Sequence, residues 1–236
     1  MRRIWAYTSS GVRRKLEKTQ KPVAGPEEAL SILSQEGITG VAIKSLHLAT
    51  GMEYKELRDI VKDRMQGQGA PGRIILSTPL LDATEDLDKS IRCLLNSLPS
   101  GTELCDALLL VAHGSRQPEA QAAYEATALF CRKFERRVLL GSLMSRPGLD
   151  EVIKECRALG IRSVVLAPLM IAAGFSARCE IAGNDPESWM SALSREGISC
   201  VPLMHGLGDH ADIVSLWLDD VERMLTELSA TEALAK

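Results

Sequence analysis

The sequence predicts an α/β protein built from two similar lobes, each with a parallel sheet. Three observations predict this class: short, almost continuously apolar runs alternate with longer amphipathic segments, glycine follows several of those segments, and part of the first half recurs in the second. Alternating strands and helices form parallel sheets with right-handed crossovers, and such strands are buried on both faces. The length of 236 residues, with 45% apolar and 25% charged residues, is ample and ordinary for such a fold.

Seven runs have the length and apolar content of strands. They are Ile4–Tyr7, Gly40–Lys44, Ile74–Ser77, Ala107–Ala112, Val138–Gly141, Val164–Pro168 and Cys200–Leu203. The segments between and after these runs have the apolar period of amphipathic helices. They are Pro26–Gln35, Tyr54–Met65, Glu85–Leu98, Glu119–Phe134, Leu149–Leu159, Pro186–Arg195 and Ile213–Leu228. Gly37, Gly160 and Gly197 stand where helices give way to strands, the usual place of a C-terminal glycine.

The repeat indicates that the two halves share one design. Residues 37–51 read GITGVAIKSLHLATG and residues 160–174 read GIRSVVLAPLMIAAG, with Gly, Ile, Val, Leu, Ala and Gly in register. Chance similarity between short α/β turns is the alternative. The second half opens with a strand and a helix over residues 107–134, whereas the first half starts without them, so the first strand–helix unit of the N-terminal lobe is missing from this sequence.

The predicted organisation follows from the repeat. Residues 1–100 form a truncated N-terminal α/β lobe, residues 101–208 a C-terminal α/β lobe, and residues 209–236 a helix that packs back on the first lobe. Paired lobes of this kind bind ligands in the cleft between them, at the carboxyl ends of the strands. A sheet edge left open by the missing strand favours association, so a homo-oligomer is an allowed partner.

Composition excludes several classes of protein. The 28 Lys and Arg against 31 Asp and Glu give a net charge of −3, so nucleic acid is not an expected partner. The longest apolar stretch, residues 164–175, is too short to cross a membrane. The six cysteines form no CxxC pair and indicate buried or free thiols in a reducing compartment. The N-terminus lacks a secretory apolar region and faintly resembles an organellar transit peptide; a cytoplasmic protein is expected.

His113 is the leading candidate for chemistry. It follows a predicted strand and precedes a helix, and Gly114 next to it allows close approach of a ligand. An imidazole there can accept a proton or bind a borderline metal, or it can simply bond to a neighbouring loop. His47 ends another strand, but the repeat places Met170 at the matching position, which favours a half-buried packing role.

Three further side chains have weaker cases. His205 and His210 flank a short glycine-containing loop, with a spacing that suits a metal, although a solvated loop before the last helix is the commoner interpretation. Cys179 could join a cleft site, but a buried thiol is the more common role. The sequence has no GxGxxG, Walker A or GxSxG motif, so nucleotide binding and α/β-hydrolase chemistry are unsupported.

Stretches spread over nearly the whole chain resemble the anaerobic cobalt chelatases of the CbiK type. They are Trp5–Ser9, Arg14–Leu16, Pro26–Leu30, Ser45–His47, Gly51, Glu53–Tyr54, Pro79–Leu81, His113–Gly114, Ala122–Tyr124, Pro168–Met170, Ala173–Gly174, Ala182–Gly183, Asp185, Ser188–Trp189 and Gly206–Gly208. The resemblance implies the two-lobed class II chelatase fold, with an active cleft between the lobes. It also implies insertion of Co(II) into sirohydrochlorin for cobalamin synthesis, with cobalt as a substrate and no organic cofactor.

The resemblance implies a metal site that this sequence only partly keeps. The family holds the ion with two histidines and one glutamate; His113 matches the first histidine and is the expected catalytic residue. Met144 stands at the glutamate position and Ser176 at the second histidine position. Whether Cys179, Glu180 or His205 replaces a lost ligand is left open. Loss of the glutamate removes a negative charge and a proton acceptor, so we expect slow or absent cobalt insertion.

Cations gather at the predicted strand ends. Lys44, Arg116, Arg146 and Arg178 fall there, at positions that the family fills mostly with neutral residues. Sirohydrochlorin carries eight carboxylates, so this rim fits a polyanion, unless some of these side chains point to solvent. The predicted tetrapyrrole-binding set also includes Thr8, Ser9, His47, Gly114 and Ser115.

The sequence leaves several functions open. The first is a tetrapyrrole chelatase with weakened or lost activity, and the second is a non-catalytic relative that binds a tetrapyrrole or metal as a carrier or subunit. The third is a structural or interaction protein that completes its sheet with a partner strand. Fold analogy alone does not choose between them.

Overall fold

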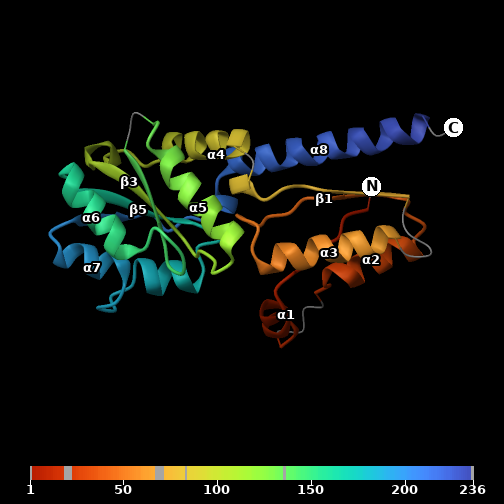
Figure 1. Ribbon diagram of the computed structural model, residues 1–236, viewed down its shortest axis with the longest axis horizontal. Helices are drawn as coiled ribbons and strands as arrows, with labels where there is room; N and C mark the ends of the chain where they lie inside the picture. Colours follow the sequence, from red (N-terminus) through yellow and green to blue (C-terminus); the bar gives the residue numbers. More distant parts are fainter. Residues whose placement is uncertain (1, 19–22, 67–71, 83, 135–136, 235–236) are drawn as a thin grey trace. The chain divides into compact units, whose positions relative to one another are not determined.

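The computed structural model describes the chain except residues 1, 19–22, 67–71, 83, 135–136 and 235–236 (Figure 1). It forms two compact units. The first unit comprises residues 1–79 and 217–236, and the second comprises residues 80–216. Residues 80–100 thus group with the second unit, and the predicted lobe boundary near residue 100 stays a prediction. No helix in the described part of the chain is long and apolar enough to span a lipid bilayer.

The first unit consists of a two-stranded parallel sheet and helices. Its elements are α1 (Ser10–Glu17), α2 (Pro26–Gln35), β1 (Gly40–Ile43), α3 (Met52–Gln66), β2 (Arg73–Leu76) and the end of α8 (Ala211–Leu234). The strands β1 and β2 pair in parallel, with Val41 beside Ile74. Leu30, Leu57 and Val61 from α2 and α3 pack on these two strands, because the apolar period of each helix faces the sheet (Figure 1).

The second unit carries a four-stranded parallel sheet in the order β4-β3-β5-β6. Its elements are η1 (Leu80–Asp82), α4 (Thr84–Asn96), η2 (Thr102–Leu104), β3 (Ala107–Ala112), α5 (Pro118–Cys131), β4 (Val138–Ser142), α6 (Leu149–Leu159), β5 (Ser163–Leu169), η3 (Ser176–Ile181), α7 (Trp189–Arg195), β6 (Ser199–Pro202), η4 (Leu207–Asp209) and the start of α8. The predicted α/β class with parallel sheets is confirmed.

The central strand β3 is completely buried, which stabilises this sheet. All six of its residues are fully buried, since helices cover both faces, with α4 and α5 on one side and α6 and α7 on the other (Figure 1). Leu109 and Val111 pack with Leu166 of β5 and with Trp189 of α7 in one cluster. A strand buried on both faces needs the continuous apolar run that the sequence shows.

The two segments that repeat in the sequence, residues 37–51 and 160–174, begin with the same local structure. Gly37 and Gly160 both adopt the left-handed conformation, with φ of 75° and 66°. The next residue then donates its amide to the preceding helix in both halves: Ile38 to the Leu33 carbonyl at 3.0 Å and Ile161 to the Cys156 carbonyl at 2.9 Å. The same helix–glycine–strand unit therefore leads into β1 and β5.

The N-terminal segment departs from the prediction. Residues 4–7, expected to form a strand, make one isolated parallel bridge between Ala6 and Ala24. Trp5 is 78% exposed, so this short run has no core to bury its side chains against and does not extend into a strand. Helix α1 follows directly and was not predicted, because its mean hydropathy is low and it buries no residue. Helix α7 starts at Trp189, three residues later than predicted, because the Ser188 hydroxyl caps it.

All six cysteines are free thiols. Burial raises the pKa of Cys131 to about 12 and the pKa of Cys156 to about 11. These two side chains therefore act as small apolar groups of the core and not as nucleophiles.

Candidate functional site

The loop after β3 presents His113 at the carboxyl end of the sheet of the second unit. His113 is exposed, and Gly114 has a φ of 81°. A Cβ atom on Gly114 would lie 2.0 Å from Ser142 Oγ and 2.9 Å from the backbone nitrogen of Ser145. Only glycine fits here, because both the conformation and the space exclude a side chain. The loop thus lies directly against the loop that follows β4.

Met144 is the immediate neighbour of His113. Its backbone amide donates to the His113 carbonyl at 3.1 Å, and its side chain is 44% exposed. Ser176 opens the π-helical turn η3 that follows β5. Since β3 lies between β4 and β5 in the sheet, the loops that carry His113, Met144 and Ser176 emerge side by side at one edge.

The described residues contain no group of three or more His, Cys, Asp or Glu side chains arranged to hold a metal ion. Cys179, Glu180 and His205 are exposed, and none of them completes such a group with His113. The two loops joined here through the backbone thus carry one imidazole, His113, and one thioether, Met144. A thioether is a soft ligand that favours Cu(I), and it supplies neither the charge nor the basicity of a carboxylate.

The predicted cations differ in their surroundings. The Arg146 guanidinium donates to Glu151 through Nε at 2.7 Å, and this pairing raises the pKa of Arg146. Arg178 Nε donates to the Ala173 carbonyl at 3.2 Å, and Arg116 is exposed. Ser115 Oγ accepts the Gln117 amide at 3.2 Å near the start of α5. Arg116 and Arg178 thus carry charge at this edge, whereas Arg146 is partly neutralised.

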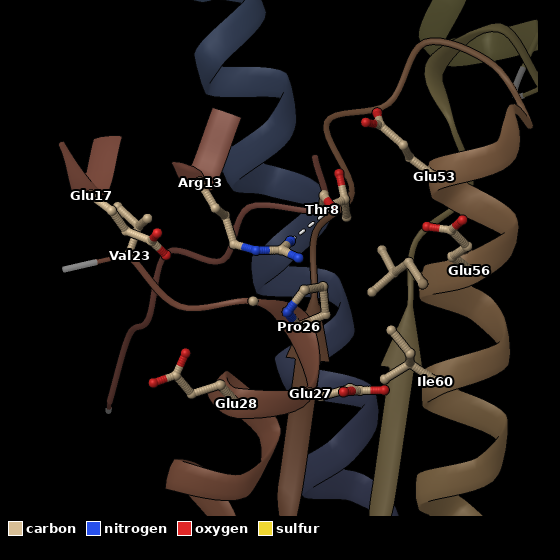
Figure 2. A pocket seen from close by; sticks show the side chains of 12 residues that line it. Thr8, Arg13, Glu17, Val23, Pro26, Glu27, Glu28, Glu53, Glu56 and Ile60 are labelled. Carbon is tan, nitrogen blue, oxygen red and sulfur yellow. Dashed lines mark hydrogen bonds between the residues drawn. The ribbon is translucent and has the colours of Figure 1, made fainter. Parts of the chain in front are cut away.

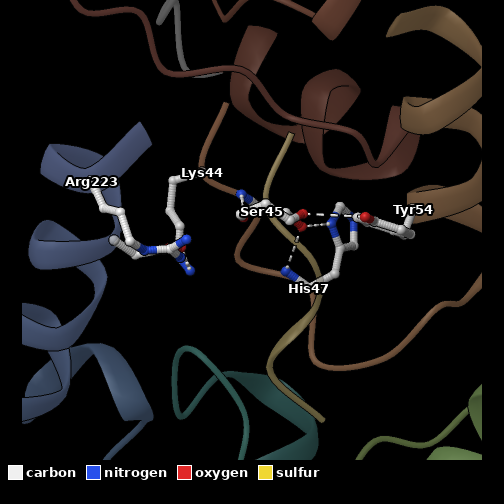
Figure 3. A network of polar contacts seen from close by, with 7 residues as sticks. Lys44, Ser45, His47, Tyr54 and Arg223 are labelled. Atoms are coloured by element: carbon white, nitrogen blue, oxygen red, sulfur yellow. Dashed lines mark hydrogen bonds and ion pairs between the residues drawn. The ribbon is translucent and has the colours of Figure 1, made fainter. Parts of the chain in front are cut away.

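Lys44, at the end of β1, is paired within the first unit. Its Nζ lies 2.6 Å from Asp220 Oδ2 of α8, with the two side chains 15% and 10% exposed. Arg223 also contacts Asp220 (Figure 3). The charge of Lys44 is therefore already matched by a nearly buried carboxylate.

His47 forms the centre of a polar network in the first unit. Its Nδ1 lies 2.8 Å from Ser45 Oγ and its Nε2 lies 3.2 Å from Thr8 Oγ1. Tyr54 packs edge-on against the ring, with 5.7 Å between the ring centroids (Figure 3). Burial lowers the pKa of His47, with Glu53 opposing it. Two neutral partners and a lowered pKa indicate an uncharged structural imidazole, in line with the packing role that the repeat favours.

Thr8 also faces a cavity of about 370 Å³ in the first unit. Five glutamates line it with Arg13, which donates to the Thr8 carbonyl at 2.8 Å (Figure 2). The glutamates are Glu17, Glu27, Glu28, Glu53 and Glu56. This concentration of carboxylates repels a polyanionic ligand. Ser9 stands at the N-cap of α1 without a capping hydrogen bond from its side chain.

Three residues that support the His113 loop were given no site role from the sequence. Ser142 and Ser145 join their hydroxyls at 2.7 Å beneath Gly114. Tyr124 of α5 lies behind the loop and is bonded to the Gly114 backbone; burial raises the pKa of this phenol to about 12. No sequence pattern marks the serines, whereas Tyr124, four residues along from Ala120, fits the buried face of the helix.

Comparison with protein families gives a match over almost the whole chain. A sequence model of the family described as cobalt chelatase (CbiK) matches residues 1–226. The sirohydrochlorin cobaltochelatase CbiKC of Nitratidesulfovibrio vulgaris is 33% identical over 224 residues, covering 95% of this chain and 79% of the relative. The sirohydrochlorin cobaltochelatase of Salmonella typhimurium is 30% identical over 223 residues, covering 93% of this chain and 82% of the relative.

Solved structures share the fold. SirB from Bacillus subtilis with Fe³⁺ superimposes with a TM-score of 0.61 and 17% identity, covering 97% of this chain and 94% of that one. The sirohydrochlorin chelatase SirB from Bacillus subtilis subspecies spizizenii in complex with cobalt gives a TM-score of 0.55 at 15% identity, covering 91% and 87%. The similarity spans both units, and the expected chelatase fold is confirmed.

Proposed function

The chain belongs to the cobalt chelatase (CbiK) family, and from this premise we propose that it binds a sirohydrochlorin-type tetrapyrrole and inserts Co(II) far more slowly than its relatives. Cobalt is a substrate in this proposal. The relatives at 33% and 30% identity are named as sirohydrochlorin cobaltochelatases, which supports the ligand class. The six free thiols are consistent with a reducing, cytoplasmic setting.

One observation supports the slow rate. The Met144 amide donates to the His113 carbonyl at 3.1 Å, so the residue at the position of the family glutamate is a backbone neighbour of His113, and its side chain is a thioether. Insertion requires a held metal ion and a base for the pyrrole N–H protons. A positioned general base contributes about 10² to 10⁴-fold to a rate, so its loss slows insertion by about that factor.

The charges near His113 suit the tetrapyrrole better than the metal. Arg116 lies on the loop after β3 and Arg178 lies in η3, both at the carboxyl edge of the same sheet. The described residues contain no group of three or more His, Cys, Asp or Glu side chains arranged to hold a metal ion. Guanidinium groups bind carboxylates through paired hydrogen bonds. We therefore expect the macrocycle to bind through its carboxylates while the metal is held weakly.

An absorption assay tests the proposal. Sirohydrochlorin is mixed with the protein, with and without Co(II), and the spectrum is followed over time. We expect a protein-dependent shift on binding, and metallation little faster than the uncatalysed reaction. Rapid metallation that His113→Ala abolishes would overturn the slow rate, and an unchanged sirohydrochlorin spectrum together with no binding would overturn the ligand class.

A restoring variant sharpens the test. Met144→Glu combined with Ser176→His returns the family ligands beside His113, and we expect the insertion rate to rise by about 10² to 10⁴-fold. Met52→Glu is a matched control, because Met52 is an exposed methionine of the first unit. No gain in the restored variant, with its fold intact, would contradict the assigned role of these positions.

A second function is favoured by the same replacements. A protein that binds the macrocycle without metallating it acts as a carrier or subunit for a tetrapyrrole or its metal derivative. Met144 supports this function, because a methionine at the position of the family glutamate supplies no base for the pyrrole protons. Its side chain is exposed on the loop bonded to His113, so a ligand can still reach this edge of the sheet. Binding without measurable turnover, in both the absence and presence of Co(II), distinguishes it from slow insertion.

A further inference from the structure

The loop between β6 and α8 is held firmly against the loop that follows β5. Leu207 donates its amide to the Met170 carbonyl at 2.7 Å, and Gly208 donates to the Ile171 carbonyl at 2.9 Å. A Cβ atom on Gly206 would lie 2.5 Å from that Ile171 oxygen. The backbone between His205 and His210 is therefore closely packed against the neighbouring loop.

The contacts of Ser97 indicate which tautomer His210 adopts. The Ser97 hydroxyl donates to the Leu94 carbonyl at 3.0 Å. With its one proton used there, the serine oxygen accepts across the 3.0 Å contact with His210 Nδ1, and we assign the ring proton to Nδ1. The lone pair of the neutral ring is then on Nε2, which is buried without a hydrogen-bond partner in the described structure.

This arrangement is the one that metal-binding histidines adopt. Such a histidine donates one ring N–H to a neighbouring oxygen and offers the other nitrogen to the ion. Asp209 and Asp212 flank His210 in the chain and supply negative charge to this loop.

His205 provides the second imidazole. Its ring centroid lies 6.2 Å from that of His210, with 52° between the ring planes. With metal–nitrogen distances near 2.0–2.1 Å, two imidazoles on one ion have centroids about 5 Å apart at the tetrahedral angle and about 6 Å apart as that angle opens. The side chain of His205 is exposed, so a small rotation closes the remaining distance.

We propose that His205 and His210 together bind one divalent transition-metal ion through their imidazoles, with water completing the coordination. Imidazole favours Co²⁺, Ni²⁺, Cu²⁺ and Zn²⁺ over Mg²⁺ and Ca²⁺. The loop follows β6, so this site lies at the same carboxyl edge of the sheet as His113, two strands away from β3. This site is additional to the proposed function and does not depend on it.

The test is a titration of Co(II) into the His113→Ala protein, followed by the visible absorption of bound Co(II) and by calorimetry. The His113→Ala background removes the other exposed imidazole at this edge, so the signal reports on His205 and His210. We expect saturable binding of one ion that is lost when His205→Ala is added. We expect Ser97→Ala to weaken binding by about 10 to 100-fold, as is typical when the partner of a ligating histidine is removed.

Two controls keep the result interpretable. Circular dichroism checks the fold of each variant, and His205→Ala is the primary variant because this side chain is exposed. Long-range ¹H–¹⁵N spectra of the metal-free protein test the tautomer of His210 directly. Equal Co(II) affinity with and without His205, or no binding at millimolar Co(II), would overturn the site, and neither outcome bears on sirohydrochlorin binding.

Discussion

Replacing Gly114 by alanine tests the packing that supports the His113 loop. Alanine at a φ of 81° adopts the left-handed conformation, which costs about 1–2 kcal/mol. The new methyl group would also lie 2.0 Å from Ser142 Oγ and 2.6 Å from Ser145 Oγ. These hydroxyls are bonded to each other at 2.7 Å, and the Ser145 backbone nitrogen at 2.9 Å from the methyl group cannot rotate away.

The steric part of the destabilisation by Gly114→Ala can be measured by comparison with the same substitution at Gly160. Overpacking a filled site costs about 1–3 kcal/mol, so Gly114→Ala should lower the free energy of unfolding by about 2–5 kcal/mol in total. Gly160, at the C-terminus of α6, has a φ of 66°, but a Cβ atom there would meet nothing within 4 Å. Gly160→Ala therefore carries only the conformational cost of about 1–2 kcal/mol.

Urea denaturation followed by circular dichroism measures both variants. Both substitutions stiffen the unfolded chain equally, so that effect cancels in the comparison. We expect Gly114→Ala to be less stable than Gly160→Ala by about 1–3 kcal/mol at an unchanged slope with urea. Equal losses, within about 0.5 kcal/mol, would show that the loops after β3 and β4 are not packed as described.

Two other predictions concern the first unit. Lys44→Met should lower the free energy of unfolding by about 2–4 kcal/mol, because the nearly buried Asp220 carboxylate loses its buried partner and keeps only the exposed Arg223. The double variant with Asp220→Leu should recover much of the loss. A loss below about 0.5 kcal/mol in urea denaturation would contradict a structural ion pair. Burial lowers the pKa of His47 in the folded state, and Glu53 opposes this shift. The unfolded state therefore binds the proton more readily. The free energy of unfolding should fall as the pH drops below 6.5, the ordinary pKa of histidine. His47→Gln should make the melting temperature depend less on pH between about pH 7 and pH 5. A smaller pH dependence should remain, because the pKa of His210 is lowered as well. If the pH dependence of the melting temperature is unchanged, it does not come from His47.

Predictions from the sequence succeeded where a local pattern decides the structure. The strand β3 and helices α2 and α6 have the predicted bounds, because an unbroken apolar run or a proline or glycine at a helix end fixes them. The prediction of a strand at residues 4–7 failed, because an apolar run becomes a strand only beside another strand. Within the described part of the chain this segment forms one bridge, at Ala6.

The candidate site divides in the same way. The exposed His113 beside Gly114 could be inferred from the residues. The absence of two family metal ligands, at Met144 and Ser176, is implied by the resemblance to the family and stays a prediction. The roles of the cations could not be inferred, because the sequence does not show that Lys44 meets Asp220, 176 positions away, or that Arg146 pairs with Glu151. Which charge is free for a ligand depends on such partners.

The sequence by itself determined the α/β class, the repeated helix–glycine–strand unit and the chelatase family, because periodicity, glycine conformation and motif residues are local properties of the chain. Only the tertiary structure decided which side chains support the His113 loop and which nitrogen of His210 is left unpartnered. Those facts arise from contacts such as Ser142 with Gly114 and Ser97 with His210, which join residues 28 and 113 positions apart. Hydrogen bonds and steric contacts over such separations exist only after the strands have assembled.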